Sequence, residues 1–402
     1  MTPMTDLASR WLGGSVVAAS DESFGEKENL LNPAPAAFEP GHYGNRGEIV
    51  DGWETKRRRE PGHDWAIIRL GAPGVITSVD IDTSFFTGNF PQTASIEACG
   101  CEGYPSPGEL AGPATVWEQI VPVSKLTGDS HNVFTVTDTR RFTHIRLSAH
   151  PDGGIARLRV LGQVVPDPRE LDGLTIDLAG QEHGGLVAES SDDFYTSAGH
   201  LNRPDRARTM GEGWETQRRR GPGHDSVLFR LAFAGVVRRI VVDTAHFKYN
   251  ASAAVELYGC AEDPSPPHDS PAWAPLLTRT RLQPDTRHVL PAASIQPVST
   301  VRLDAFPDGG LSRVRLLGSI TAEARRAAGY RWFNTLPARQ ALDCLANAGI
   351  PAGLATAITG QRPLSQDEPV GLRNAAKDSE ASAYRLLAAM LEGRQAAPEL
   401  GA

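Results

Sequence analysis

The sequence predicts an all-β protein with two tandem, homologous jelly-roll β-sandwiches, followed by a small C-terminal α-helical appendix. Three observations lead to this prediction. The 402 residues suffice for two or three domains, and 40 Gly and 30 Pro indicate a turn-rich chain. A long internal repeat divides most of the sequence into two halves. Within each half, apolar and polar residues alternate as they do in strands with one buried face.

The internal repeat is the strongest of these signals. Residues 52–64 read GWETKRRREPGHD and residues 213–225 read GWETQRRRGPGHD, so that 11 of 13 positions are identical. Other segments correspond in the same order: 13–18 with 184–188, 79–86 with 240–247, 96–101 with 255–260, and 144–162 with 300–318. We therefore expect one repeat at 12–163, a second at 175–319 and an appendix at 320–402.

Each repeat contains several segments with a period of two, which predicts short strands without helices between them. The clearest in the first repeat are 66–70, 79–82, 145–147 and 158–161. The sequence PDGG, at 151–154 and again at 307–310, is predicted to form a turn that joins two antiparallel strands into a hairpin. This pattern favours a β-sandwich or a jelly roll.

Beyond the second repeat, apolar residues recur at helical spacing, for example at Ala341, Leu342, Leu345 and Ala348. The composition there is rich in Ala, Leu and Arg, which are strong helix formers. We expect helices at 321–330, 337–348, 352–359 and 379–393. These helices would make up the appendix.

The composition excludes several classes of protein. An excess of acidic over basic residues gives a net charge of −8, which predicts no nucleic-acid partner and no attraction to an anionic membrane surface. No run approaches the roughly 20 apolar residues that span a bilayer. Four cysteines favour a reducing compartment, and residues 11–19 are too short and glycine-containing for a signal peptide. We expect a soluble cytoplasmic protein.

Three successive arginines in each copy of the repeated block point to an anion site. Guanidinium groups suit a carboxylate or a phosphate because they donate in a planar, bidentate geometry. In an extended segment neighbouring side chains alternate in direction, so at most two of each three could serve one site. A solvated basic surface is the alternative. The binding candidates are Arg57, Arg58, Arg218 and Arg219.

The same block supplies candidate general acids and bases, because carboxylates and histidines can transfer protons during catalysis. In sequence order these catalytic candidates are Glu54, His63, Asp64, Glu215, His224 and Asp225. The alternative for each His-Asp pair is a hydrogen bond that orders the loop. Trp53 and Trp214 are expected in the core.

Further candidates for substrate binding follow a predicted strand in each repeat. They are Asp82, Thr83 and Asn89, with Asp243, Thr244 and Asn250 in the second copy. An Asp-Thr at a strand end could equally fix a turn through side-chain to backbone hydrogen bonds. Asp152 and Asp308, in the two PDGG segments, are interpreted as turn residues.

The sequence supplies no recognisable metal or nucleotide motif. H-E-x-x-H, C-x-x-C and His-x-His spacings are missing, and of Cys99 and Cys101 only Cys101 is repeated, as Cys260. Phosphate-binding glycine motifs and the G-x-S-x-G elbow are missing as well. We assign no metal ligand and no cofactor, although carboxylates could bind a divalent cation without a readable motif.

The repeated features together resemble the allantoicase (allantoate amidinohydrolase) family. The resemblance covers about residues 12–319 and rests on the doubled GWET-x-RRR-x-PGHD, on DTSFFTGNFP with its counterpart DTAHFKYN, and on the doubled PDGG followed by RLRVLG or RVRLLG. It implies two jelly rolls of galactose-binding-like fold. It also implies a hydrolase that converts allantoate to ureidoglycolate and urea in purine (allantoin) degradation.

The two halves depart from each other at several positions of these motifs. Tyr249 stands where the family usually has Gly, Ser226 replaces Trp65 of the first copy, and Ala251-Ser252 replaces Phe90-Pro91. The halves are therefore not equivalent. Whether both hold a site, or one holds it and the other supports it, is left open.

The appendix resembles, more weakly, the N-terminal part of the decarboxylase that acts on 2-oxo-4-hydroxy-4-carboxy-5-ureidoimidazoline (OHCU decarboxylase). The similar segment runs from 333–337 through 360–363, without the later catalytic His and Glu segments of that family. We expect no decarboxylase activity, and instead a role in docking or in contacts of a homo-oligomer.

The competing interpretation is a non-catalytic tandem β-sandwich that binds a small ligand or a carbohydrate, since fold alone does not determine chemistry. Such modules usually present exposed aromatic residues. Here aromatic residues make up 7% of the chain, and the repeated block consists largely of Arg, Glu, His and Asp. These features favour the enzyme.

Overall fold

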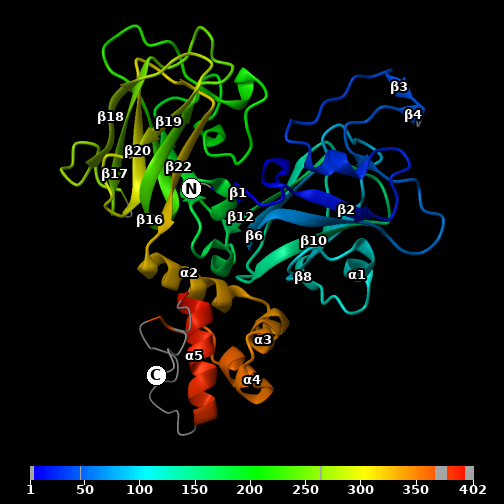
Figure 1. Ribbon diagram of the computed structural model, residues 1–402. Coiled ribbons are helices and arrows are strands. Elements are labelled where there is room, and N and C mark those ends of the chain that lie inside the picture. The colour runs from blue at the N-terminus through cyan, green and yellow to red at the C-terminus, as the bar shows by residue number, and fades with distance from the viewer. Residues whose placement is uncertain (1–3, 46, 263–264, 367–377, 394–402) are drawn as a thin grey trace. The chain divides into compact units, whose positions relative to one another are not determined.

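The computed structural model describes residues 4–45, 47–262, 265–366 and 378–393. It divides into two compact units (Figure 1). One unit holds Met4–Val165 together with Thr335–Ala341. The other holds Pro166–Asn334 and the described part of Leu342–Ala402. Each unit contains one β-sandwich with its own apolar core.

The strands of the first sandwich form one hydrogen-bonded network in the order β1-β12-β6-β10-β7-β8, with β2 and β9 also paired to β6. Two short pairs, β5 with β11 and β3 with β4, complete it. The strand bounds are β1 (Thr5–Asp6), β2 (Ser15–Ala19), β3 (Tyr43–Gly44), β4 (Gly47–Glu48), β5 (Trp53–Glu54), β6 (Asp64–Asp82), β7 (Thr93–Cys99), β8 (Glu118–Lys125), β9 (His131–Thr135), β10 (Arg141–His150), β11 (Gly154–Ile155) and β12 (Arg157–Val164).

The long strand β6 belongs to both layers of this sandwich. Its first part lies between β2 and β10, and its last part lies between β9 and β12. The alternating segments 66–70 and 79–82 are therefore parts of one continuous strand. Its side chains alternate between buried and partly exposed along most of its length, as the period of two predicts.

The second sandwich repeats this topology in the order β13-β22-β16-β20-β17-β18, with β14 and β19 paired to β16. The prediction of two tandem jelly-roll sandwiches is confirmed. The bounds are β13 (Ile176–Asp177), β14 (Leu186–Ser190), β15 (Trp214–Glu215), β16 (Asp225–Asp243), β17 (Ala254–Cys260), β18 (Ala274–Arg281), β19 (Arg287–Pro291), β20 (Val298–Phe306), β21 (Gly310–Leu311) and β22 (Arg313–Ile320).

The PDGG segment does not form the predicted hairpin. β10 and β12, which flank it, both pair with β6 and not with each other. The segment instead carries the chain from one layer to the other through β11, which pairs with β5. Its second glycine is required by packing, because a Cβ on Gly154 would lie 1.9 Å from Cε1 of Phe86.

The predicted correspondence of Cys101 with Cys260 is wrong by two residues. Cys99 pairs with His144 across the sheet, and Cys260 pairs with Thr300, the repeat counterpart of His144. Cys99 is thus the structural equivalent of Cys260, and both are buried. The unequal loops that follow these two strands hide this shift in the sequence.

The predicted burial of the two tryptophans is confirmed. Trp53 and Trp214 are both 0% exposed, and each belongs to the core of its own sandwich. Each indole N–H donates to a backbone carbonyl at 2.8 Å, Trp53 to Asp21 and Trp214 to Asp192. These residues place the following Glu at the same point of each sandwich.

Helices are confined to loops and to the C-terminal part of the described chain. The first is α1 (Pro107–Ala111), in a loop of the first sandwich. The helices expected after the second repeat are confirmed within a few residues as α2 (Ala322–Thr335), α3 (Ala338–Asn347), α4 (Ala352–Gly360) and α5 (Asp378–Glu392). Short 3₁₀ turns occur at η1 (Arg10–Leu12), η2 (Lys27–Leu31), η3 (Pro168–Leu171), η4 (Gln181–His183), η5 (Ala198–His200) and η6 (Met210–Glu212).

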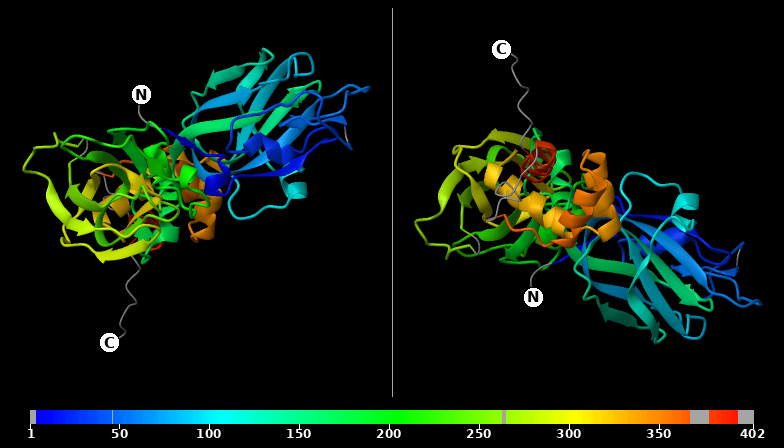
Figure 2. Two further views of the ribbon diagram at one scale, coloured as in Figure 1. Left: turned by 90° about the horizontal axis from the view of Figure 1, so that it is seen from above. Right: turned by 90° about the horizontal axis from the view of Figure 1, so that it is seen from below.

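The buried guanidinium of Arg325 ties α2 to its surroundings. It donates to the carboxylate of Asp172 and to the backbone carbonyls of Met390 and Leu391 in α5. The right view of Figure 2 shows the red α5 beside the yellow-orange α2. Among the described residues, no helix is long and apolar enough to cross a membrane.

Candidate active site

Each repeat brings a glutamate and an asparagine together across 35 residues of sequence. Asn89 donates from Nδ2 to Oε1 of Glu54 at 2.7 Å, and Asn250 donates to Glu215 at 2.6 Å. The glutamates end β5 and β15, which are held by pairing with β11 and β21. Burial raises the pKa of Glu54, against the opposing effect of the Asn89 hydrogen bond.

The middle arginine of each triplet turns inward to an aspartate of the same block. Arg58 and Asp64 form an ion pair at 2.7 Å, and Arg219 pairs with Asp225 in the same way. Both aspartates are 1% exposed. These two Arg-Asp pairs combine candidates that the sequence had placed in separate binding and catalytic groups.

The outer arginines of the triplets face solvent. Arg57, Arg59, Arg218 and Arg220 are all exposed. The described residues contain no ion pair to any of the four. Their guanidinium groups are therefore available to an anion in solution.

The buried aspartate is better satisfied in the second repeat. Oδ2 of Asp225 accepts from the Thr216 hydroxyl at 2.6 Å and from the Gly309 N–H at 3.3 Å. Burial raises the pKa of Asp225, but hydrogen bonds from Thr216 and Arg219 and the charge of Arg219 outweigh it, so that this pKa lies below its ordinary value. Oδ2 of Asp64 is buried without a hydrogen-bond partner in the described structure.

The aspartates of PDGG do more than form a turn, which corrects their interpretation from the sequence. Oδ2 of Asp152 accepts from the backbone N–H of Arg58 at 2.7 Å, and Asp308 accepts from that of Arg219 at 2.9 Å. These bonds fix the loop that carries the arginine triplet. The identical recurrence of PDGG was the available signal for such a role.

The Asp-Thr candidates hold the loop that leads to the asparagine. The Thr83 hydroxyl donates to the backbone carbonyls of Thr127 and Ser130, and Thr244 makes the equivalent bonds. Asp82 accepts from the backbone N–H of Ser84, and Asp243 from that of Ala245. All four candidate side chains are buried: Asp82, Thr83, Asp243 and Thr244. Their observed bonds match the turn alternative.

The two candidate histidines have different neighbours. The ring of His63 lies 4.6 Å from that of His150, whereas His224 lies 4.8 Å from the ring of Phe306. Burial lowers the pKa of His150, and the positive charge of His63 lowers it further. Nε2 of His224 lies 3.6 Å from the buried carboxylate of Asp304, a residue that sequence reasoning missed.

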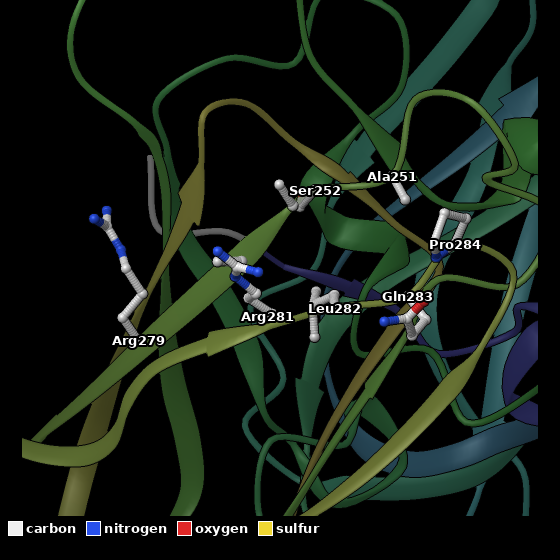
Figure 3. Close-up of a pocket in the computed structure, with 9 residues that line it drawn as sticks. Ala251, Ser252, Arg279, Arg281, Leu282, Gln283 and Pro284 are labelled. Carbon is white, nitrogen blue, oxygen red and sulfur yellow. The ribbon is translucent and has the colours of Figure 1, made fainter.

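A cavity of about 780 Å³ lies in the second repeat. Its lining includes Ala251, the residue that directly follows Asn250 in the chain. It is lined by residues 251–254 and 281–284 together with Arg279 (Figure 3). Sequence reasoning gave no indication of it because the arginines that line it are not repeated. Among the described residues, no group of three or more His, Cys, Asp or Glu side chains is placed to hold a metal ion.

Comparison with known proteins follows the same division into repeats. A family model described as the allantoicase repeat matches residues 5–165 and 176–321. The chain belongs to the allantoicase family. The family pattern thus spans both sandwiches and ends where the helices begin.

Individual relatives agree with this assignment. The chain is 46% identical over 342 residues to a probable allantoicase of Streptomyces coelicolor, covering 81% of this chain and 89% of the relative. It is 48% identical over 321 residues to a probable allantoicase of Nocardia farcinica, covering 79% and 95%. The crystal structure of allantoicase from Saccharomyces cerevisiae superposes with a TM-score of 0.68 at 35% identity, over 79% of this chain and 93% of that one.

Proposed function

We propose that this protein is a hydrolase that converts allantoate to ureidoglycolate and urea. The observation that carries the proposal is the match to allantoicases over both repeats, with close to half of the aligned residues identical. In both repeats the GWET-x-RRR-x-PGHD block contains a glutamate that is hydrogen-bonded to an asparagine, and arginines that are exposed. The exposed groups of this set suit the substrate chemically.

The substrate requires an anion clamp, since allantoate carries a carboxylate and two ureido groups on one carbon. Arg57 and Arg218 are exposed and without an ion pair among the described residues. A guanidinium that binds a carboxylate in bidentate geometry contributes about 1.5–3 kcal/mol per hydrogen bond. Arg58 and Arg219 are engaged by buried aspartates, so we assign them to holding the loop.

The glutamate of the Glu-Asn pair is suited to work on the ureido group. As a carboxylate it accepts ureido N–H bonds, and as an acid it protonates the departing urea nitrogen. The raised pKa of Glu54 increases the protonated fraction at a given pH, which favours the role of proton donor. We assign the proton transfer to Glu54 or to its counterpart Glu215.

The histidines are the second candidates for proton transfer. His63 and His224 are exposed at the end of the repeated block and lie beside β10 and β20. The double variant His63→Ala/His224→Ala decides between the two schemes. An unchanged rate would exclude the histidines and leave the glutamates, whereas a loss of a hundredfold or more, on the order of one positioned acid or base, would reverse the assignment.

The wider assignments follow from this function. We propose that the protein works in the cytoplasm as a homo-oligomer, without a nucleic-acid partner. The functional parts are the repeats 12–163 and 175–319 and the appendix 320–402, of which residues 367–377 and 394–402 lie outside the described residues. We assign docking or oligomer contact, and no decarboxylase activity, to the appendix.

Urea release from allantoate by the purified full chain tests the proposal. We expect urea in proportion to enzyme and time, both before and after exhaustive chelation. Loss of activity on chelation, with recovery when a divalent cation is returned, would add a metal to the mechanism. No urea under either condition would reject the hydrolase in favour of a small-ligand or carbohydrate-binding protein.

A further inference from the structure

The cavity of the second repeat exists because an aromatic ring of the first repeat has no counterpart there. Hydrogen bonds establish the correspondence, since Leu126 donates to the Gln92 carbonyl as Leu282 donates to that of Ala253. Counting from these pairs, Ala251 stands at the position of Phe90.

In the first repeat this space is filled. Phe90 packs against the core, and a Cβ on Gly128 would lie 2.4 Å from Cε1 of its ring. The ring therefore occupies the volume in front of Gly128. In the second repeat Pro284 stands at the position of Gly128 and the ring is reduced to the methyl group of Ala251. Figure 3 shows Ala251 and Pro284 together at one end of the cavity.

Two arginines line the open space. Arg279 and Arg281 are two residues apart on β18, so their side chains leave the same face of the strand. Their counterparts in the first repeat are Val123 and Lys125, as the register of Lys125 with Thr93 and of Arg281 with Ala254 shows. The second repeat therefore has one more basic residue at this place, together with Glu256 where the first repeat has Ser95.

The two arginines differ in how far they are engaged. The guanidinium of Arg279 lies 3.6 Å from the centre of the Phe306 ring, and its Nε lies 3.3 Å from the carboxylate of Glu256. Among the described residues Arg281 has no ion pair and no side-chain hydrogen bond. Arg281 is thus the guanidinium best able to bind an anion that enters the cavity.

The remaining lining defines the ligand class. Ala251, Leu282 and Pro284 provide apolar surface, and Gln283 provides an amide that can both donate and accept. The volume of about 780 Å³ falls within the roughly 300–1,000 Å³ typical of small-molecule sites. Such a lining suits a small organic acid with amide or ureido groups.

We propose that this cavity, with Arg281 as its ionic contact, binds a ureido-bearing carboxylate at the segment that directly follows Asn250, and that the first repeat lacks the equivalent site because Phe90 fills it. Two molecules of the proposed reaction have this chemistry, the substrate allantoate and the product ureidoglycolate. The choice of these two molecules as ligands rests on the proposed function. The cavity, its arginines and the filled counterpart do not depend on it.

The first test introduces the two equivalent residues of the first repeat into the cavity of the second. The double substitution Ala251→Phe/Pro284→Gly restores the ring and the glycine against which it packs. We expect the affinity for ureidoglycolate, measured by titration calorimetry on the full chain, to fall by about tenfold or more. We also expect the KM for allantoate to rise if the cavity holds the substrate, or inhibition by added product to weaken if it holds the product.

Arg281→Gln tests the charge without filling the space. We expect a loss of affinity of about tenfold to a hundredfold, since a charge-assisted contact is removed. The matched control is Lys125→Gln, at the equivalent position of the first repeat, which should leave affinity and kinetics as in the wild type. Circular dichroism and the melting temperature of each variant show that it is folded.

The outcomes separate the two proposals. In one outcome the wild-type protein releases urea, and the folded variants Arg281→Gln and Ala251→Phe/Pro284→Gly keep its affinity, KM and product inhibition. This outcome would overturn the cavity assignment and leave the hydrolase intact. A wild-type protein that releases no urea yet binds ureidoglycolate through Arg281 would overturn the hydrolase and keep the site.

Discussion

The ring of Phe90 in the first repeat and the cavity beside Ala251 in the second occupy equivalent places in two sandwiches of the same topology. The surrounding frame is shared, since both repeats have a Glu-Asn hydrogen bond, an inward Arg-Asp pair and a PDGG aspartate on the arginine backbone. The residues that line the cavity lie outside the repeated block.

This comparison separates two kinds of residue. Several residues that recur identically, such as Trp53, Arg58 and Asp152, are engaged in holding the sandwich and its loops. Residues that differ between the copies, such as Ala251 in place of Phe90 and Arg279 in place of Val123, line the cavity of the second repeat. Repetition within a chain thus identifies the frame more readily than the site.

The largest expected effect concerns catalysis by the two glutamates. If substrate binds in the second repeat, Glu215→Gln should lower kcat by about a hundredfold to ten-thousandfold, the usual contribution of a positioned acid or base. Glu54→Gln should lower it by less than about tenfold. Steady-state assays of urea release measure both, and equal losses would mean that the repeats share the chemistry.

The buried aspartates should differ in their contribution to stability. Asp225→Ala removes the carboxylate that accepts from the buried Thr216 hydroxyl and pairs with Arg219, so we expect a loss of about 2–4 kcal/mol in the free energy of unfolding. Asp64→Ala should cost about 1–2 kcal/mol, because its Oδ2 has no hydrogen bond to lose in the described structure and Arg58 is partly exposed and can turn to water. Urea denaturation followed by circular dichroism compares the two, and an equal cost would contradict the difference in their bonding.

His150 should make the stability of the first repeat depend on pH. Its pKa is lowered by burial and by His63, so between this pKa and the ordinary value of 6.5 the unfolded chain binds more protons than the folded one. Stability is therefore lost as the pH falls below about 6.5. His150→Phe introduces the residue that the second repeat has at this position. The free energy of unfolding of this variant, relative to that of the wild type, should be higher at pH 5.5 than at pH 8. A difference that is the same at both pH values would exclude this origin.

The exposed arginines should have the smallest effect on stability. Arg57→Ser and Arg218→Ser remove side chains without an ion pair among the described residues. The free energy of unfolding, measured by thermal melting, should therefore change by no more than about 0.5 kcal/mol. Any rise in KM in these variants then reports substrate binding alone. A rise for Arg218→Ser only would sharpen the contrast between the repeats.

Much of the fold could be predicted because local patterns carry it. The period of two locates the strands, the repeat gives the two sandwiches, and the helical spacing after residue 320 gives the helices. The helix α1 was missed although Ser106 and Glu109 form a capping box that can be read from sequence. The crossover at PDGG could not be seen, because a turn sequence does not reveal which distant strand each flank pairs with.

The site was predictable in its residue types but not in its pairings. Glu54 and Asn89 were both candidates, yet their contact depends on how β5 and the loop after β6 approach in space. The division of the arginine triplet into one inward and two outward side chains agrees with simple alternation. The cavity was out of reach, because it results from the absence of a ring and from arginines without a repeat partner.

The sharing of β6 and β16 between two layers has a consequence for how each repeat folds. Neither layer can be completed before the other, since one continuous strand supplies hydrogen bonds to both. Pairing partners such as β6 and β12 are also far apart in sequence, and non-local pairing slows folding. Each repeat should therefore form and open as one cooperative unit, with amide protons of both layers exchanging together with solvent.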